Sequence, residues 1–182
     1  MKLVDTDLPE VKIIEPAVFG DDRGFFLESW NAAAFAKAGL DLTFVQDNHS
    51  RSAKGVLRGL HYQRRQPQGK LVRVARGAVF DVAVDIRPTS PNFGKWVGVT
   101  LSEANKRMLW VPPGFAHGFL TLEDGTDFLY KCTDFYRPDD EHSVIWSDPD
   151  IGIDWPFQNI DAPLLSAKDG KAPRLADAET RP

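Results

Sequence analysis

Short runs of alternating apolar and polar residues, divided by turn-forming residues, limit the fold of this chain more than any other feature. Over residues 80–86, large apolar side chains occupy every second position and alternate with Asp81, Ala83 and Asp85. A period of two is typical of a β-strand, and here it predicts a strand that is buried on one face only. Further strands are predicted at 71–74, 96–101, 108–111, 128–135 and 144–146.

Turn-forming residues separate these runs at short intervals, for example at 88–94 and 138–140. One short helix is predicted from Asn31, its N-cap, to Lys37. Many short strands with few helices are typical of a mainly β fold, a sandwich or a jelly-roll barrel. The 182 residues contain no repeat or linker, so we expect a single domain over 1–182, with a loosely held C-terminal tail at 170–182.

The only cysteine, Cys132, cannot form an intramolecular disulfide, which favours a cytoplasmic protein. No segment approaches the roughly 18 apolar residues of a membrane-spanning helix, and Asp5 interrupts any signal-peptide core. The net charge of −4 gives no general reason to expect binding to nucleic acid. We therefore expect neither a membrane nor a nucleic acid as partner.

Positive charge is concentrated between Asp47 and Asp81. This segment has no acidic residue and eight basic ones, so the rest of the chain carries a net charge of −12. A local basic segment suggests a bound anion, although a solvated basic face explains the charge equally well. The basic residues are Arg51, Lys54, Arg58, Arg64, Arg65, Lys70, Arg73 and Arg76.

Common motifs for nucleotide cofactors, serine hydrolysis and zinc proteases are absent. The four histidines, His49, His61, His117 and His142, include no close His-x-His pair that would give two metal ligands from one barrel strand. A single cysteine excludes a cysteine-rich zinc site. We therefore expect no bound metal ion.

His61 lies within the basic segment, between Arg58 and Lys70. A neutral imidazole accepts a proton near pH 7, and the two cations can hold an anion or an enolate oxygen. The alternative is a structural histidine with ordinary hydrogen bonds. His117 follows small and aromatic residues in a turn, so a structural role is as reasonable as a ligand contact.

Tyr130 shares one face of its predicted strand with Phe128 and Cys132. It is either a core tyrosine with one hydrogen bond or a general acid in a cavity. Asp169 follows Ser166 by three positions, the spacing of a helix capping box, which the spacing alone favours. The alternative is a carboxylate that orients a catalytic histidine.

Eight motifs occur together, in order, along almost the whole chain. They are DRGFFLE at 22–28, QDNHS at 46–50, GVLRGLHYQ at 55–63, QGKLV at 68–72, PGFAHGF at 113–119, FLYK at 128–131, GIDWP at 152–156 and SAKD at 166–169. In this combination the chain resembles the dTDP-4-dehydrorhamnose 3,5-epimerase family. The resemblance implies a cupin-type jelly roll that works as a homodimer without a cofactor.

The resemblance also implies a reaction. The substrate is the dTDP-4-keto-6-deoxyhexose dTDP-4-dehydro-6-deoxy-D-glucose, and inversion at C3 and C5 gives dTDP-4-dehydro-L-rhamnose in dTDP-L-rhamnose biosynthesis. Each inversion removes a proton alpha to the C4 ketone and returns one on the opposite face.

Individual roles follow from the same resemblance. It implies His61 as the base, oriented by Asp169, with Tyr130 as the acid and Lys70 at the enolate oxygen. Arginine suits a pyrophosphate because guanidinium binds phosphate through two parallel hydrogen bonds. The implied substrate-binding residues are Arg23, Phe26, Glu28, Gln46, Asp47, Asn48, Arg58, His117, Tyr136, Glu141 and Lys168.

Three alternatives remain. A relative that inverts only C3 or only C5 keeps the His61–Asp169 pair, so that pair cannot distinguish it, whereas Tyr130 and its surroundings can. A non-catalytic cupin that binds a nucleotide sugar has no need of His61, Lys70, Tyr130 and Asp169 together. A metal-dependent cupin isomerase or oxygenase requires a metal ion that analysis of the purified protein would detect.

Overall fold

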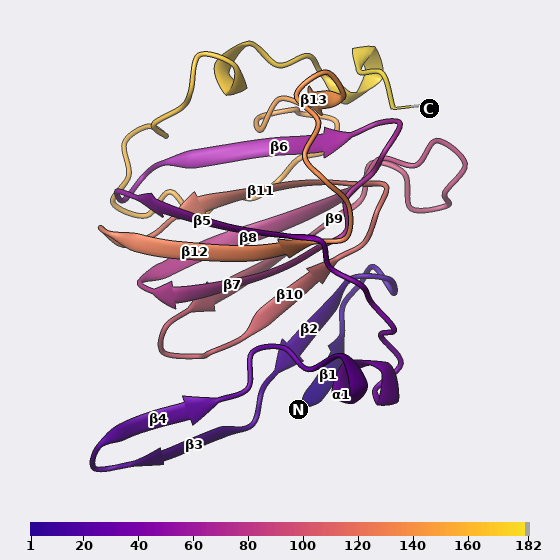
Figure 1. The fold of residues 1–182 in the computed structure, drawn as a ribbon. Helices are drawn as coiled ribbons and strands as arrows, with labels where there is room; N and C mark the ends of the chain where they lie inside the picture. The colour runs from indigo at the N-terminus through magenta and orange to yellow at the C-terminus, as the bar shows by residue number, and fades with distance from the viewer. Residues whose placement is uncertain (181–182) are drawn as a thin grey trace.

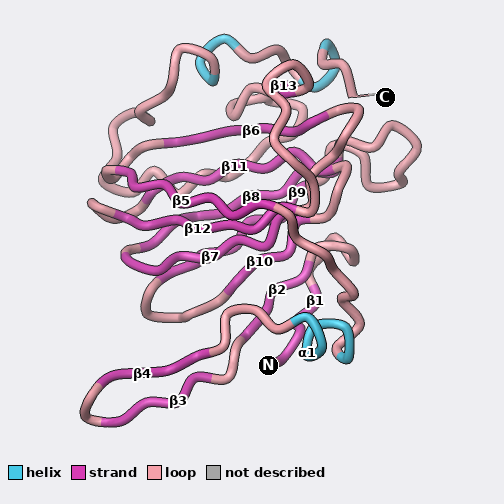
Figure 2. The backbone as a smooth tube through the Cα atoms, in the orientation of Figure 1, coloured by secondary structure: helices cyan, strands magenta, loops and turns pink. Residues whose placement is uncertain are grey.

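The computed structural model describes residues 1–180 as a β-strand-rich chain with few helical turns (Figure 2). The single α-helix of this part is α1 (Ala32–Lys37), and the 3₁₀ helices are η1 (Asp169–Lys171) and η2 (Leu175–Asp177). The strands are β1 (Lys2–Asp5), β2 (Lys12–Glu15), β3 (Val18–Asp21), β4 (Gly24–Leu27), β5 (Gln46–Ser52), β6 (Leu57–Gln63), β7 (Lys70–Arg76), β8 (Ala78–Asp85), β9 (Trp96–Ser102), β10 (Met108–Val111), β11 (Phe115–Thr121), β12 (Thr126–Cys132) and β13 (Glu141–Ser143).

Two antiparallel sheets lie face to face (Figure 1). The larger has the strand order β1-β2-β10-β7-β12-β5, and the smaller has the order β13-β6-β11-β8-β9. Strands distant in the chain are therefore neighbours in both sheets. This mainly β, cupin-like arrangement confirms the predicted fold class.

Apolar side chains from both sheets fill part of the space between them. Val72 and Val74 of β7 pack with Phe119 of β11 and Phe128 of β12, and the two phenyl rings stack with centroids 4.1 Å apart. Burying a side chain of this size contributes about 1.5–3 kcal/mol. This core fixes the distance between the sheets.

Strand β8 confirms the predicted alternation, but the prediction of a single buried face was wrong. Asp81 and Asp85 are both 0% exposed. The side of β8 that bears Asp81 faces the space between the sheets, where Ala83 joins the core. On the other side, Val82 and Val84 are covered by the C-terminal part of the chain, which includes Trp155.

The C-terminal tail is more ordered than its composition predicts. Leu175 is buried, and its backbone N–H donates to the Asp148 carboxylate at 2.7 Å. The Tyr62 hydroxyl donates to the carbonyl oxygen of Glu179 at 2.9 Å. The described part of the tail, residues 170–180, therefore packs against the five-stranded sheet. Leu175 and Ala178 cover apolar side chains of the outer face of that sheet. Residues 181–182 of the expected tail lie outside the described residues.

Other local predictions have mixed outcomes. Helix α1 is confirmed, and the Asn31 side chain accepts from the backbone N–H of Ala34 at 3.1 Å, as an N-cap does. The strands expected at 71–74, 96–101 and 108–111 are confirmed within β7, β9 and β10. The strand expected at 144–146 was wrong, because β13 ends at Ser143 and the chain then turns.

A two-stranded hairpin of β3 and β4 extends away from both sheets (Figure 1). Phe19, Phe25 and Phe26 are exposed on it, the last at 68%. Within residues 1–180, no helix has the length and hydrophobicity that crossing a membrane requires.

Candidate active site

A cavity of about 360 Å³ lies between the sheets, and strands β5, β6, β7, β11 and β12 supply most of its walls. Small-molecule sites typically measure roughly 300–1,000 Å³. Apolar rings cover part of its surface and polar groups the rest. The predicted site residues that line it are Gln46, Asn48, Arg58, His61, Lys70, His117, Tyr130, Tyr136 and Glu141.

His61 and Asp169 form a hydrogen-bonded pair at this cavity. Nε2 of His61 lies 2.6 Å from Oδ1 of Asp169, whose side chain is almost completely buried. Burial alone would raise the pKa of the Asp169 carboxyl, but hydrogen bonds with His61, Ser166 and the Gly59 backbone together lower it. The aspartate therefore stays ionised and fixes the ring, which leaves Nδ1 as the free nitrogen of His61.

Asp169 makes the contacts that each of the two interpretations requires. Its backbone N–H donates to Ser166 Oγ at 3.1 Å, the contact that the capping-box spacing predicts. Its carboxylate meets His61 at the same time. The 3₁₀ helix η1 begins at Asp169, so this local turn orients the carboxylate.

Tyr130 and Lys70 come from neighbouring strands of the opposite sheet, β12 and β7. Burial raises the pKa of the Tyr130 hydroxyl, and Cys132 adds to the increase. Loss of solvent lowers the pKa of Lys70, whereas nearby Cys132 and Asp81 favour its charged form. The cavity therefore offers a protonated phenol and an amine on the wall that faces His61.

His117 and His61 are directly paired in the register of β11 and β6. Two glycines allow these strands to approach closely: a Cβ on Gly59 would lie 2.5 Å from Cα of Gly118, and one on Gly118 would lie 2.7 Å from the Arg58 carbonyl oxygen. Gly59 also has φ of +131°, which side chains rarely adopt. The glycine contact therefore sets the spacing of the two histidine-bearing strands.

A second histidine–aspartate pair lies deeper in the cavity. Nε2 of His117 is 3.0 Å from both carboxylate oxygens of Asp81, and both side chains are buried. The sequence reasoning missed Asp81 because alternation placed it on an exposed face. The signal available in the sequence was a carboxylate flanked by Phe80 and Val82, with no basic residue beside it.

Strand β5 divides the predicted nucleotide-binding residues between its two faces. Gln46 and Asn48 line the cavity, and the Gln46 amide donates to Asn48 Oδ1 at 3.1 Å. Asp47 points the other way and pairs with Lys131 at 2.9 Å. The side chain of Asp47 is thus not part of the cavity, because neighbouring residues of a strand face opposite sides.

Three of the eight basic residues of this segment, Arg51, Arg64 and Arg65, form ion pairs with acids from elsewhere in the chain. Arg51 pairs with Asp127 at 2.6 Å on the β5–β12 ladder. By contrast, Arg58 lines the cavity, and among residues 1–180 its guanidinium donates to the neutral Ser52 Oγ alone, at 3.3 and 3.2 Å. Arg58 is therefore the arginine of this segment that is placed to meet an anion in the cavity.

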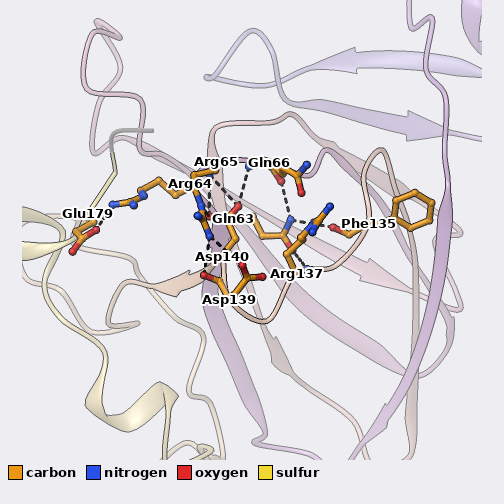
Figure 3. Close-up of polar contacts among 9 residues, drawn as sticks. All are labelled: Gln63, Arg64, Arg65, Gln66, Phe135, Arg137, Asp139, Asp140 and Glu179. Carbon is orange, nitrogen blue, oxygen red and sulfur yellow. Dashed lines mark hydrogen bonds and ion pairs between the residues drawn. The ribbon is translucent and has the colours of Figure 1, made fainter.

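The loop after β6 is tied to the loop after β12, as Figure 3 shows. Asp140 accepts from the backbone N–H groups of Arg65 and Gln66 at 2.9–3.1 Å, and the Arg65 Nε–H joins it at 3.1 Å. Gln63 accepts from the backbone N–H of Arg137 at 2.8 Å. These contacts hold in place the loop that carries Tyr136 and leads to Glu141, the first residue of β13.

Tyr136, Glu141 and Lys168 form a polar network at the edge of the cavity. The Tyr136 hydroxyl donates to Glu141 Oε2 at 2.8 Å, and Lys168 forms an ion pair with the same oxygen. The hydrogen bond to Glu141 and some burial raise the pKa of Tyr136 to about 12. The ion pair with Glu141 thereby brings Lys168 to the edge of the cavity, while its sequence neighbour Asp169 contacts His61.

Comparison with known proteins identifies the family. The family model described as dTDP-4-dehydrorhamnose 3,5-epimerase matches residues 5–177. The dTDP-4-dehydrorhamnose 3,5-epimerase of Pseudomonas aeruginosa is 59% identical over 183 residues, which covers 100% of both chains. The chain belongs to this family. The resemblance inferred from the motifs is therefore confirmed.

Solved structures of the family share the fold. A dTDP-6-deoxy-D-glucose-3,5-epimerase from Legionella pneumophila, in complex with dTDP-4-keto-L-rhamnose, superposes with a TM-score of 0.93 at 55% identity; 97% of this chain and 93% of that chain are covered. A 3'-monoepimerase from Streptomyces bikiniensis, in complex with dTDP-quinovose, has a TM-score of 0.87 at 38% identity, with 94% and 87% covered. The fold is thus shared by double and single epimerases.

Three substrate-binding residues that the family implies lie outside the cavity. Arg23 and Phe26 are on the β3–β4 hairpin, where Arg23 pairs with Asp21, and Glu28 follows β4 and accepts from Asn31 at 3.0 Å. All three are exposed. Within a single chain, the structure does not bring them together with His61.

Across residues 1–180, no group of three His, Cys, Asp or Glu side chains is arranged to hold a metal ion. The two histidines of the cavity each use Nε2 on an aspartate instead. The polar groups of this epimerase cavity are therefore suited to proton transfer and hydrogen bonding.

Proposed function

We propose that this chain, as an isomerase of dTDP-L-rhamnose biosynthesis, inverts C3 and C5 of dTDP-4-dehydro-6-deoxy-D-glucose to give dTDP-4-dehydro-L-rhamnose. The observation that carries the proposal is the placement of His61 and Tyr130 on opposite walls of one cavity. Inversion requires a base on one face of the sugar and an acid on the other, and the two sheets supply one each.

The first step is proton removal. Asp169 holds Nε2 of His61, so Nδ1 accepts the proton from the carbon next to the C4 ketone. The electron pair of that C–H bond becomes the enolate, with its negative charge on the C4 oxygen. A positioned base of this kind typically contributes about 10²–10⁴-fold in rate.

The enolate requires a positive charge beside its oxygen. Lys70 lines the cavity, where burial lowers the pKa of its amine while Cys132 and Asp81 favour the charged form; in that form it attracts an oxyanion more strongly than in water. Tyr130 then donates its hydroxyl proton to the opposite face of the same carbon. Its raised pKa keeps the hydroxyl protonated until that step.

The dTDP part extends from the sugar toward the open end of the cavity. Four residues that line the cavity support this orientation: we assign Arg58 to the pyrophosphate, and Gln46, Asn48 and the exposed ring of Tyr136 to the nucleoside. The ion pair of Lys168 and Glu141 forms the remaining part of the cavity edge in this assignment. One unpaired cysteine, Cys132, supports a cytoplasmic location for this reaction.

The active form in this proposal is a homodimer. Arg23 and Phe26 lie on an exposed hairpin that extends away from the sheets (Figure 1), Glu28 follows that hairpin, and none of the three lines the cavity of its own chain. The exposed Phe19 and Phe26 are cross-strand partners on the hairpin and form an apolar surface that a second copy would cover. We therefore place each hairpin at the cavity of the other chain.

Complementation tests this arrangement. Arg23→Ala impairs the hairpin and His61→Ala impairs the cavity, so each variant alone is expected to be nearly inactive. After the two are unfolded together and refolded as a mixture, mixed dimers contain one intact cavity beside one intact hairpin, and part of the activity returns. No recovery, with dimers present in light scattering, would show that each hairpin serves its own chain.

The reaction itself is tested by incubating the protein with dTDP-4-dehydro-6-deoxy-D-glucose in D₂O and following the sugar by proton NMR. Loss of both the C3 and C5 proton signals supports the double epimerase. Exchange at one carbon only assigns the chain to the single epimerases. Binding without exchange at either carbon would reject the proposed chemistry.

A further inference from the structure

Asp81 is a buried titratable group that the mechanism above does not use. It is 0% exposed, lies in the middle of β8, and forms its side-chain hydrogen bonds within the described residues with His117 of the cavity wall. Burying a carboxylate is costly unless it is paired and hydrogen-bonded. Burial raises the pKa of Asp81, while His117 and Lys70 favour its charged form. The presence of a buried acid that is hydrogen-bonded to a cavity histidine suggests that the acid has a use in the reaction.

The geometry of the pair is specific. Both carboxylate oxygens lie 3.0 Å from Nε2 of His117, so that nitrogen donates and carries a proton. The ring of Phe128 stacks on the imidazole with centroids 6.1 Å apart, which restrains its plane. Only Nδ1 of His117 is then available to a molecule in the cavity.

The register places His117 at the sugar end of the substrate. It is the cross-strand neighbour of His61, the proposed base, and the contact between Gly59 and Gly118 holds the two strands close. A group beside the base meets the reacting ring and not the nucleoside. The orientation of His117 therefore affects the chemical step.

We propose that Asp81 is a positioning residue for the epimerisation, which binds Nε2–H of His117 and so presents Nδ1 to the sugar. Without the carboxylate, the imidazole can carry its proton on either nitrogen and rotate by half a turn. The inference rests on the proposed function. It adds a second histidine–aspartate pair, which orients the sugar while His61 and Asp169 move the proton.

The test is Asp81→Asn, which preserves shape and removes the charge. We expect kcat to fall at least about 10-fold, a part of the roughly 10²–10⁴ that depends on a well-placed acid or base. Affinity for dTDP alone, which lacks the sugar, stays unchanged. In nitrogen-15 NMR, the wild-type His117 shows a proton fixed on Nε2, and this signal is lost in the variant.

Asp85→Asn is the matched control, because Asp85 is on the same strand, is also 0% exposed, and binds Arg87 away from the cavity. We expect it to lower the melting temperature while the folded protein keeps its kcat. If Asp81→Asn behaves in the same way, the carboxylate is only structural and the inference is wrong.

A double variant shows whether Asp81 affects turnover through His117 or through a general effect on the structure. With His117→Gln already present, Asp81→Asn should cost no further activity, because coupled residues are not additive. Additive losses would overturn the proposal. If Asp81→Asn folds neither alone nor together with His117→Gln, the nitrogen-15 NMR spectrum of the wild type decides. A proton on Nδ1 of His117 and none on Nε2 would contradict the assigned geometry. Failure of the proposed function is distinct, because wild type itself would then exchange no proton in D₂O.

Discussion

Nε2 of His61 lies 2.6 Å from Oδ1 of Asp169, a residue 108 positions later in the chain. The pair joins a central strand of one sheet to the C-terminal segment. It therefore couples the acid–base chemistry of the site to the packing of the end of the chain, and both can be measured.

Asp169→Asn is expected to change how stability depends on pH. The pKa of Asp169 is lowered in the folded protein from an ordinary value of 3.8, so the carboxylate stabilises the fold above that value. This contribution is lost as pH falls through the lowered pKa. Melting temperatures of wild type and variant should thus converge below about pH 3.8. A constant gap from pH 6 to the acid limit would contradict the assignment.

His61→Ala is expected to lower turnover by at least about 10²-fold, because the reaction loses its base. Turnover is measured as loss of the C3 and C5 proton signals in D₂O. His49→Ala is the control, since His49 lies on the exposed β5 strand and binds Asp127. Near-normal turnover in His61→Ala would remove His61 from the mechanism.

Tyr130→Phe is expected to separate proton exchange from inversion. His61 can still remove a proton and return deuterium to the same face, whereas the opposite face has lost its donor. Deuterium should therefore enter the substrate faster than the epimerised product forms, as NMR of the two sugars will show. An equal loss of exchange and inversion would argue against Tyr130 as the acid.

Arg58→Ala is expected to weaken dTDP binding by about 10–100-fold, which corresponds to the roughly 1.5–3 kcal/mol of hydrogen bonds to a charged group. Isothermal titration with dTDP measures the effect. Arg51→Ala removes a basic residue of the same segment that is paired with Asp127 outside the cavity, and should bind normally. Equal affinities for wild type and Arg58→Ala would exclude a phosphate contact.

Gly118→Ala is expected to cost about 1–3 kcal/mol of stability and to lower activity, because the added Cβ would lie 2.7 Å from the Arg58 carbonyl oxygen. Gly20→Ala meets its nearest atom at 3.6 Å and serves as the control in chemical denaturation. A fully stable and active Gly118→Ala protein would show that the strand spacing is not limiting.

The sequence predicts those parts of the fold in which local pattern and tertiary packing agree. Alternation identifies β8, and Asn31 identifies the start of α1. Strand β5 has the sequence QDNHSRS, with no apolar alternation, because it is an edge strand with one face on a polar cavity. Periodicity therefore cannot find it, although the family motif at 46–50 marks it as functional.

The site was predictable in its residue types and less so in its arrangement. The motifs indicate His61, Lys70, Tyr130 and Asp169, and the fold brings these four together. A linear pattern cannot show that the hairpin residues lie away from the cavity. Nor can alternation alone show that the face of β8 with Asp81 is interior, because that depends on a sheet packed opposite it.

Asp169 arrives on the last packed segment of the chain, beyond every strand of both sheets. During synthesis, the two sheets are thus complete in sequence before the residue that orients His61 has been added. A chain that ends, or is cleaved, before η1 lacks Asp169. It therefore cannot form the His61–Asp169 pair, even when its strands have assembled. Catalytic activity is consequently expected to report that the chain has been made, and has stayed intact, at least as far as η1.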